Sequence, residues 1–157
     1  MKFLKRPEAG FTIIELVVVI IILCILGTLV ALTYSGVQAN NRDNQRQSEI
    51  DTLQSQLELY YAMHDRYPLV SDINSASWRA ENMKELKEDV LKDPHWSEKG
   101  RCQVDKKPIL ATAESCYSYE VTASDGAVCD NAAAVCAHYT LTAVLENGEK
   151  YIKASLN

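Results

Sequence analysis

The residues with the clearest chemical potential lie near the N-terminus, where Glu15 is the single charged residue in an apolar run from Phe11 to Leu32. A carboxylate inside a membrane helix is costly, by at least about 2.5 kcal/mol at the helix centre. Cleavage of the chain between Gly10 and Phe11 would create a cationic amine one helical turn from Glu15. Because residues three or four apart on a helix are neighbours, the spacing predicts an ion pair between this amine and Glu15, within one copy or between two.

The apolar run is long enough to cross a membrane, because residues 11–32 make roughly 33 Å of helix and a bilayer core is about 30 Å thick. Lys2, Lys5 and Arg6 precede the run and predict a cytoplasmic N-terminus. An ordinary secretory signal would be cut after the run, for instance at residues 37–39, but this interpretation leaves the acidic residue unexplained. A simple one-span anchor is another alternative, and it requires no particular residue at position 10 or 15.

Residues 10–16, Gly-Phe-Thr-Ile-Ile-Glu-Leu, resemble the class III signal of type IV pilins and type II secretion pseudopilins. The resemblance is specific over residues 5–34. It implies that a prepilin peptidase cuts between Gly10 and Phe11 and methylates the new N-terminus on Phe11. It also implies that Glu15 neutralises the amine of a neighbouring subunit during filament assembly. Many family members have a proline near the membrane exit of this helix, and this chain has none there.

Four parts are expected along the chain: a leader at 1–10, a hydrophobic transmembrane and assembly helix at 11–33, an amphipathic continuation at 34–64 and a globular head at 65–157. Residues 40–47 contain no apolar side chain, so we expect them to stand off the head or to face other subunits. Beyond them, apolar residues at steps of three and four predict a stripe that packs on the head. The stripe comprises Ile50, Leu53, Leu57 and Tyr60 or Tyr61, and the opposite face, with Glu49, Gln56 and Glu58, is expected to be solvated.

The head is expected to carry a small antiparallel sheet laid on this stripe, an α+β arrangement that resembles the pilin fold. Tyr67-Pro68 should end the long helix. A polar loop at 72–78 and a short amphipathic helix at 81–92 are predicted next. Alternation of apolar and polar residues predicts strands at 117–122, 139–145 and 151–153, and Asn147-Gly148 is a strong hairpin signal between the last two.

Four of the five cysteines, Cys102, Cys116, Cys129 and Cys136, lie in the C-terminal third. An even number in a small exported domain predicts two disulfides, with three possible connectivities. We favour Cys102–Cys116 and Cys129–Cys136, because short local loops close easily and a strand follows each second cysteine. The spacings are neither C-x2-C nor C-x4-C, which argues against zinc. Cys24 is expected to be a small apolar residue of the membrane run.

No constellation of residues predicts an enzyme or a cofactor site. The three histidines are expected on the surface. Residues 125–126 and 130–131 could join a calcium site, but Asp-Gly and Asp-Asn pairs more often form turns, so no bound metal is expected. Removal of the leader, which carries +2, takes the net charge from −5 to −7. The acidic balance argues against nucleic-acid binding, which needs clustered basic residues.

The resemblance, together with these features, implies a structural subunit of a type IV pilus, assembled through its hydrophobic N-terminal helix. A pseudopilin of a type II secretion system is the first alternative, and a membrane-anchored binding domain that never polymerises is the second. The expected partners are further copies or other pilins, the prepilin peptidase and an inner-membrane platform of the pilus or secretion machinery. The precursor is expected in the membrane with its N-terminus in the cytoplasm, and the assembled form outside the cell or at its surface.

Overall fold

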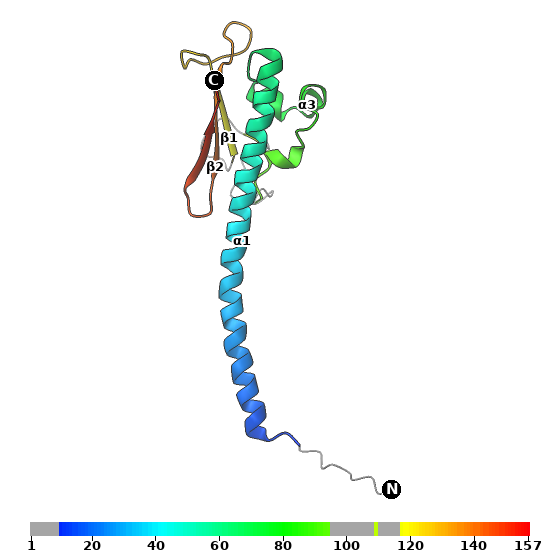
Figure 1. Cartoon of the computed structure of the whole chain (residues 1–157), viewed down its shortest axis with the longest axis vertical. Coiled ribbons are helices and arrows are strands. Elements are labelled where there is room, and N and C mark those ends of the chain that lie inside the picture. The colour runs from blue at the N-terminus through cyan, green and yellow to red at the C-terminus, as the bar shows by residue number, and fades with distance from the viewer. Residues whose placement is uncertain (1–9, 95–108, 110–116) are drawn as a thin grey trace, which may run out of the picture. The chain divides into compact units, whose positions relative to one another are not determined.

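The computed structural model describes residues 10–94, residue 109 and residues 117–157, and for residues 30–35 it describes the backbone alone. The chain divides into two compact units, Met1–Ala39 and Asn40–Asn157. The elements follow one another as α1 (Ile13–His64), α2 (Val70–Asn74), α3 (Ala76–Asn82), the 3-10 helix η1 (Glu88–Leu91), β1 (Tyr117–Thr122), β2 (His138–Val144) and β3 (Lys150–Ala154), as Figure 1 shows. One long helix and a small antiparallel sheet make the α+β class predicted from the sequence.

Helix α1 runs from Ile13 to His64 without interruption, as the absence of proline predicts. Its end is set by Asp65, which adopts a left-handed backbone (φ 53°) and donates its N–H to the carbonyl of Tyr61 at 2.8 Å. A left-handed residue just past the last turn is a common helix stop, and aspartate is among the few non-glycine residues that tolerate it. The helix therefore closes at Asp65, just before the Tyr67-Pro68 pair that was predicted to end it.

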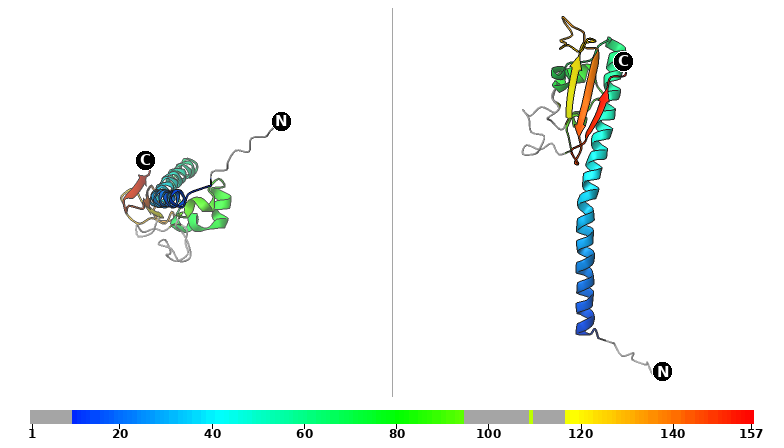
Figure 2. Two further views of the ribbon diagram at one scale, coloured as in Figure 1. Left: turned by 90° about the horizontal axis from the view of Figure 1, so that it is seen from below. Right: turned by 90° about the vertical axis from the view of Figure 1, so that its left-hand side faces the viewer.

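The sheet has the strand order β1-β2-β3, with both pairings antiparallel (Figure 2). Its register places Tyr119 opposite Leu141, and both side chains are fully buried. The three predicted strands are all present, with β2 shifted by one residue and β3 longer by one residue at each end. Period-two alternation thus located the sheet correctly, because each strand has one face on the core.

The core of the unit Asn40–Asn157 contains the predicted apolar stripe of α1. Ile50, Leu53 and Leu57 have no exposed surface, and Tyr60 rather than Tyr61 is the buried tyrosine, at 5% exposure. Figure 1 shows the strands on one side of this part of α1 and α3 on the other. The stripe is therefore covered from both sides.

The hairpin between β2 and β3 has a three-residue loop. The N–H of Leu145 donates to the carbonyl of Glu149 at 2.8 Å, and the N–H of Gly148 donates to the carbonyl of Leu145 at 3.0 Å. Gly148 has φ 85°, whereas Asn147 does not enter the left-handed region. A turn followed by one left-handed glycine is the usual three-residue hairpin, so the Asn-Gly pair marks the turn but only its glycine uses the special conformation.

The segment between α1 and β1 differs from its prediction. Residues 72–78, predicted as a loop, belong mostly to α2 and α3, and residues 81–92, predicted as one helix, contain only the end of α3 and η1. Ser75 caps α3 by accepting the N–H of Trp78 at 3.4 Å. Met83, Leu86 and Leu91 are buried, so their spacing reflects core contacts made by largely irregular chain and not one face of a helix.

Candidate functional site

The predicted processing site lies at the start of α1. Gly10 and Phe11 are exposed and precede the first helical residue, Ile13, and the Phe11 side chain is 78% exposed. The peptide bond that a prepilin peptidase would cut is therefore outside the helix and accessible in the free chain.

Glu15 forms a capping box with Thr12. One carboxylate oxygen, Oε2, accepts from the Thr12 N–H at 3.4 Å and from the Thr12 hydroxyl at 3.3 Å, and the Glu15 N–H donates to that hydroxyl at 3.3 Å. The box satisfies N–H groups that have no partner at a helix start, and a carboxylate there is also favoured by the helix dipole. The Thr-x-x-Glu signature of this box is present in the sequence, but Glu15 was predicted only to pair with an amine.

The apolar side chains after Glu15 are exposed around the whole helix. From Leu16 to Leu29 the large apolar residues range from 43% exposure at Val19 to 60% at Leu23. Over the described part of the chain, no helix combines the length and the hydropathy required of a membrane span. A helix that is apolar on all sides is normally buried, so this segment presents a surface suited to contact with other apolar groups.

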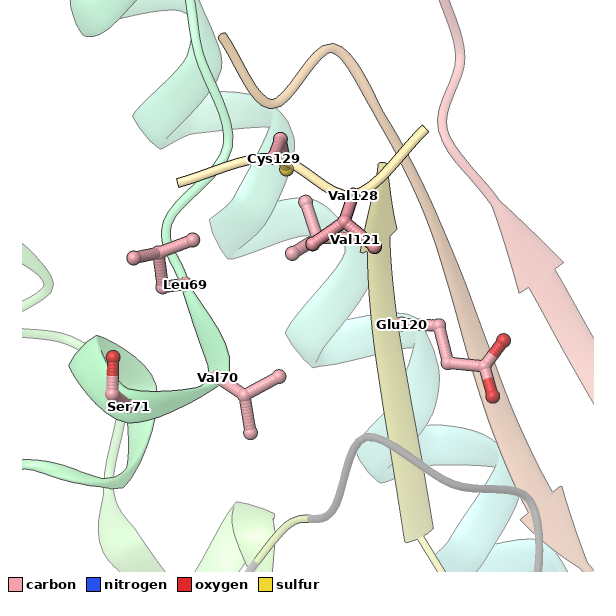
Figure 3. A pocket seen from close by; sticks show the side chains of 7 residues that line it. All are labelled: Leu69, Val70, Ser71, Glu120, Val121, Val128 and Cys129. Carbon is pink, nitrogen blue, oxygen red and sulfur yellow. The ribbon is translucent and has the colours of Figure 1, made fainter. Parts of the chain in front are cut away.

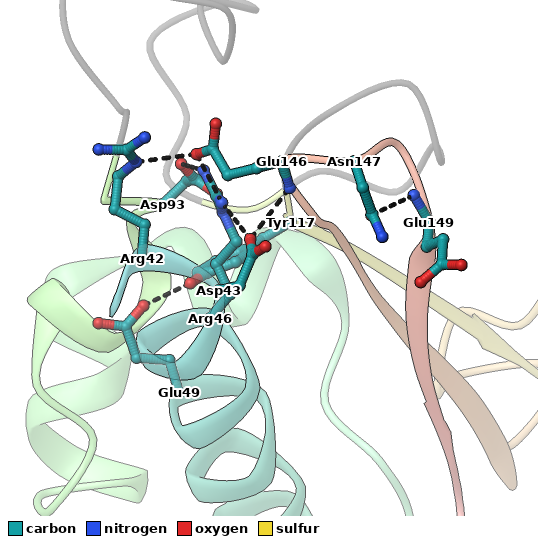
Figure 4. A network of polar contacts seen from close by, with 9 residues as sticks. All are labelled: Arg42, Asp43, Arg46, Glu49, Asp93, Tyr117, Glu146, Asn147 and Glu149. Atoms are coloured by element: carbon teal, nitrogen blue, oxygen red, sulfur yellow. Dashed lines mark hydrogen bonds and ion pairs between the residues drawn. The ribbon is translucent and has the colours of Figure 1, made fainter. Parts of the chain in front are cut away.

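A network of charged side chains surrounds Arg46, as Figure 4 shows. The guanidinium binds both carboxylate oxygens of Asp93, at 2.6 and 3.1 Å, and its third nitrogen binds Asp43 at 2.7 Å and Glu146 at 2.9 Å. The side chains of Arg46 and Asp93 are 3% and 1% exposed. Burial lowers the pKa of Arg46, but the hydrogen bonds to Asp93 and Glu146 outweigh it and raise that pKa above its usual value.

Glu146 joins this network from the β2–β3 hairpin. Its carboxylate accepts from Arg42 at 2.8 Å, and its N–H donates to Asp43 at 3.0 Å. The hydrogen bond from Arg42 is the largest cause of a pKa of about 2 for Glu146, against a usual 4.5, with burial opposing the shift and Arg46 adding to it. The prediction that residues 40–47 stand off the head is therefore wrong: their charges bind the hairpin and Asp93, and a polar run in sequence gives no sign of such partners.

The carboxylates of Glu49 and Glu58 also bind the head, which corrects the expectation of a solvated face. Glu49 accepts the hydroxyl of Tyr117, and burial, partly offset by that bond, raises the Glu49 pKa. Glu58 accepts the hydroxyls of Tyr67 at 3.0 Å and Tyr139 at 2.7 Å. Burial, reinforced by Glu58, raises the pKa of both tyrosines, so they remain neutral donors near pH 7.

Two of the four cysteines predicted to form disulfides lie within the described residues. Cys129 and Cys136 form a disulfide, which is the pairing favoured for these two residues. Cys102 and Cys116, like His95, lie outside the described residues. Asn131, within the disulfide loop, donates to the Tyr67 carbonyl at 2.8 Å and accepts the Cys136 N–H at 2.9 Å. The loop is thereby tied to the chain just after α1.

The candidate calcium residue Asp130 acts as a turn residue. Its Oδ1 accepts the N–H groups of Ala132, Ala133 and Ala134 at 2.7–3.2 Å, and these bonds lower the pKa of its carboxyl. Within the described ranges no group of three or more His, Cys, Asp or Glu side chains could hold a metal ion.

A shallow hollow of about 390 Å³ lies between β1 and the start of α2 (Figure 3). It is lined by Leu69, Val70, Ser71, Glu120, Val121, Val128 and Cys129. Figure 3 shows the Glu120 carboxylate pointing away from the other lining residues. The hollow therefore brings no nucleophile and base together.

Comparison with known proteins agrees with the signal at the N-terminus. Residues 5–31 match the prokaryotic N-terminal methylation motif. The chain is 37% identical over 65 residues to the type II secretion system core protein G of Dickeya chrysanthemi, and 38% identical over 64 residues to that of Aeromonas hydrophila. Each match covers 41% of this chain, and 42% and 45% of the relatives, so the chain spans less than half the length of either. No solved structure matches the chain. These matches support the resemblance to type IV pilins and type II secretion pseudopilins that the signal sequence predicts.

Proposed function

We propose that the chain is a pseudopilin, a structural subunit of the filament of a type II secretion system. The observation that supports this best is the pair of relatives, both named as type II secretion system core protein G. The sequence pattern placed a type IV pilus subunit first, because the signal is common to both classes. The relatives favour the secretion system, which was the alternative.

In this proposal the prepilin peptidase removes residues 1–10 and methylates Phe11, and the subunit is then drawn from the membrane into a filament. The capping box uses Oε2 of Glu15, which leaves Oε1 outside the box. This geometry allows the carboxylate to accept from a Phe11 amine while the helix start stays capped. The protein has no enzymatic role here, and its partners are further subunits, the peptidase and an inner-membrane platform.

The two roles of Glu15 can be separated by substitution. Glu15→Gln keeps the capping box, because glutamine serves at this position as well as glutamate, but it removes the charge that would pair with the amine. Thr12→Ala removes the capping hydroxyl, at a cost of about 1 kcal/mol of helix stability, and keeps the charge. If charge pairing drives assembly, Glu15→Gln abolishes filaments and Thr12→Ala does not.

The test is made in cells that contain the peptidase. Mass spectrometry of the N-terminus should find an N-methylated Phe11, and electron microscopy should find filaments from the parent chain and from Thr12→Ala. An intact Met1 in the working protein would contradict processing. Normal filaments from Glu15→Gln would contradict the charge role.

A gene deletion separates the two kinds of filament. For a pseudopilin, we expect exported proteins to accumulate inside the cell envelope while surface pili persist. Loss of surface pili with normal secretion would favour the type IV pilus instead.

A further inference from the structure

The turn between β2 and β3 contains the one Asn-Gly pair of the sequence, Asn147-Gly148. Asparagine is a chemically labile residue, because the backbone nitrogen of the next residue can attack its side-chain amide. A glycine in that next position has no Cβ to hinder the approach. Both residues of the pair are exposed. The hairpin therefore presents a reactive pair at the surface.

The side chain of Asn147 is held by its oxygen alone. Its Oδ1 accepts the N–H of Glu149 at 2.9 Å, and Figure 4 shows the side chain directed at that residue and away from Arg46. A donor on this oxygen stabilises the negative charge that develops there when the carbonyl carbon is attacked. Within the described part of the chain, the Nδ2 amide has no hydrogen-bond partner. The group that would leave is thus unrestrained.

Two other asparagines of the head are held at both ends of the amide. Asn74 precedes Ser75, which is also small, but its Nδ2 donates to the Ile109 carbonyl at 2.8 Å and its Oδ1 accepts the Ile109 N–H at 3.2 Å. Both ends of the Asn131 amide are bonded as well. Attack on either carbonyl requires these bonds to break, so we expect Asn147 to react first.

One contact in the turn opposes the reaction. The N–H of Gly148 donates to the Leu145 carbonyl at 3.0 Å, and this bond must open before the nitrogen can attack. Exposed turns with few buried contacts open locally at a small cost in free energy. We therefore expect Asn147 to react more slowly in the folded chain than in the unfolded chain, but faster than Asn74 in the same molecule.

We propose that Asn147 is a site of spontaneous deamidation, which modifies irreversibly the hairpin that binds α1. The backbone nitrogen of Gly148 forms a bond to Cγ of Asn147 and closes a succinimide ring. The bond from Cγ to Nδ2 breaks, and Nδ2 leaves as ammonia with the proton of the Gly148 N–H. Water then opens the ring. Opening at Cγ gives aspartate, and opening at the backbone carbonyl gives isoaspartate, in which the main chain runs through Cγ.

The two products should affect the hairpin differently. In the aspartate product a carboxylate oxygen can still accept the N–H of Glu149, and Asp-Gly is as suitable for a hairpin as Asn-Gly. The isoaspartate product lengthens the main chain by one carbon next to Glu146, which binds Arg42 and Asp43 of α1. Isoaspartate should therefore loosen the hairpin from α1, and aspartate should not. This chemistry belongs to the chain alone and does not depend on the proposed function.

The test is incubation of the purified full-length chain in mildly alkaline water enriched in heavy oxygen, followed by mass spectrometry of its peptides. We expect aspartate and isoaspartate at position 147, each with one oxygen atom from the water, and faster conversion at higher pH because the attacking nitrogen must lose its proton. Asn74 is the internal control. Asn147→Ser is the blocked variant, because serine has no side-chain carbonyl.

Three outcomes would overturn the proposed site: no conversion at position 147, equal conversion at Asn74, or conversion only when the chain is unfolded in urea. The effect on α1 is measured by hydrogen exchange of the Glu146 N–H, which donates to Asp43. We expect exchange to be several-fold faster in the isoaspartate fraction and unchanged in freshly prepared Asn147→Asp. Equal exchange rates in these two samples would overturn the proposed loosening of the hairpin.

Discussion

Replacement of Arg46 by alanine should be among the most damaging single changes in the unit Asn40–Asn157. The substitution removes the guanidinium that binds both oxygens of Asp93, whose side chain is 1% exposed. Removing one partner of a buried ion pair costs about 3–5 kcal/mol, because the other charge stays buried. For a domain of this size, a loss of 1 kcal/mol in the free energy of unfolding lowers Tm by about 4 °C. We therefore expect Tm to fall by about 12–20 °C.

The assay is thermal unfolding of the purified full-length chain, followed by near-ultraviolet circular dichroism at pH 7. Arg42→Ala is the matched control, because that arginine is 25% exposed and is paired with Glu146 at 2.8 Å, and an ion pair open to water adds little stability, so Tm should fall only slightly. Arg46→Lys keeps the charge but not the bidentate geometry, so its Tm should lie between those of Arg46→Ala and Arg42→Ala. A loss below about 1 kcal/mol for Arg46→Ala would show that Asp93 does not depend on the guanidinium.

The remaining predictions concern the hairpin and the disulfide loop. The pKa of Glu146 is lowered to about 2, so the stability that its ionised carboxylate contributes is present above pH 4.5 and is lost as pH falls toward 2. The free energy of unfolding should therefore fall by no more than about 3 kcal/mol across that range. In Glu146→Gln the free energy of unfolding should depend less on pH between 4.5 and 2. Gly148→Ala places a side chain at φ 85° and should lower the unfolding free energy by about 1–2 kcal/mol in urea titration. Replacing Cys129 and Cys136 by serine opens a loop of eight residues and should cost about 2.5 kcal/mol in the same assay. Asn131→Ala removes one hydrogen bond from this loop to the Tyr67 carbonyl, after α1, and one within the loop to the Cys136 N–H. It should lower the free energy of unfolding by about 1–3 kcal/mol in urea titration, and an unchanged midpoint would show that these two bonds do not stabilise the loop.

The features that the sequence predicted correctly are those encoded by local periodicity and by strong stop signals. The stripe of Ile50, Leu53 and Leu57 follows from the helical repeat, and the three strands follow from alternation, because in both cases one face of a regular element is buried. The disulfide between Cys129 and Cys136 follows from the short loop that it closes. Each of these needs information only from neighbours in sequence.

The features that were missed depend on partners far away in the sequence. Arg46 binds Asp93 and Glu146, 47 and 100 residues further along, and a run of polar residues looks the same whether it meets water or carboxylates. The segment 70–92 was misplaced for a related reason, because its helices are only five and seven residues long and short helices are fixed by tertiary packing more than by propensity. The capping box of Thr12 and Glu15 could have been predicted from the Thr-x-x-Glu pattern, but Glu15 was interpreted only as a charge in an apolar run.

The charged side chains of α1 beyond Asn40 are directed mainly at the head. A helix that served the head alone could leave its charges in water, where they cost nothing and aid solubility. In this chain Arg42, Arg46 and Glu58 are instead directed at the head, although enclosing ionic groups is rarely a gain in stability by itself. The arrangement leaves few charged side chains on the other side of the helix, where hydroxyl groups donate to backbone carbonyls of the same helix. The helix thus binds the sheet of its own unit through its charged side, and Ser55→Lys on the other side should leave the free energy of unfolding unchanged in urea titration, because that position is exposed.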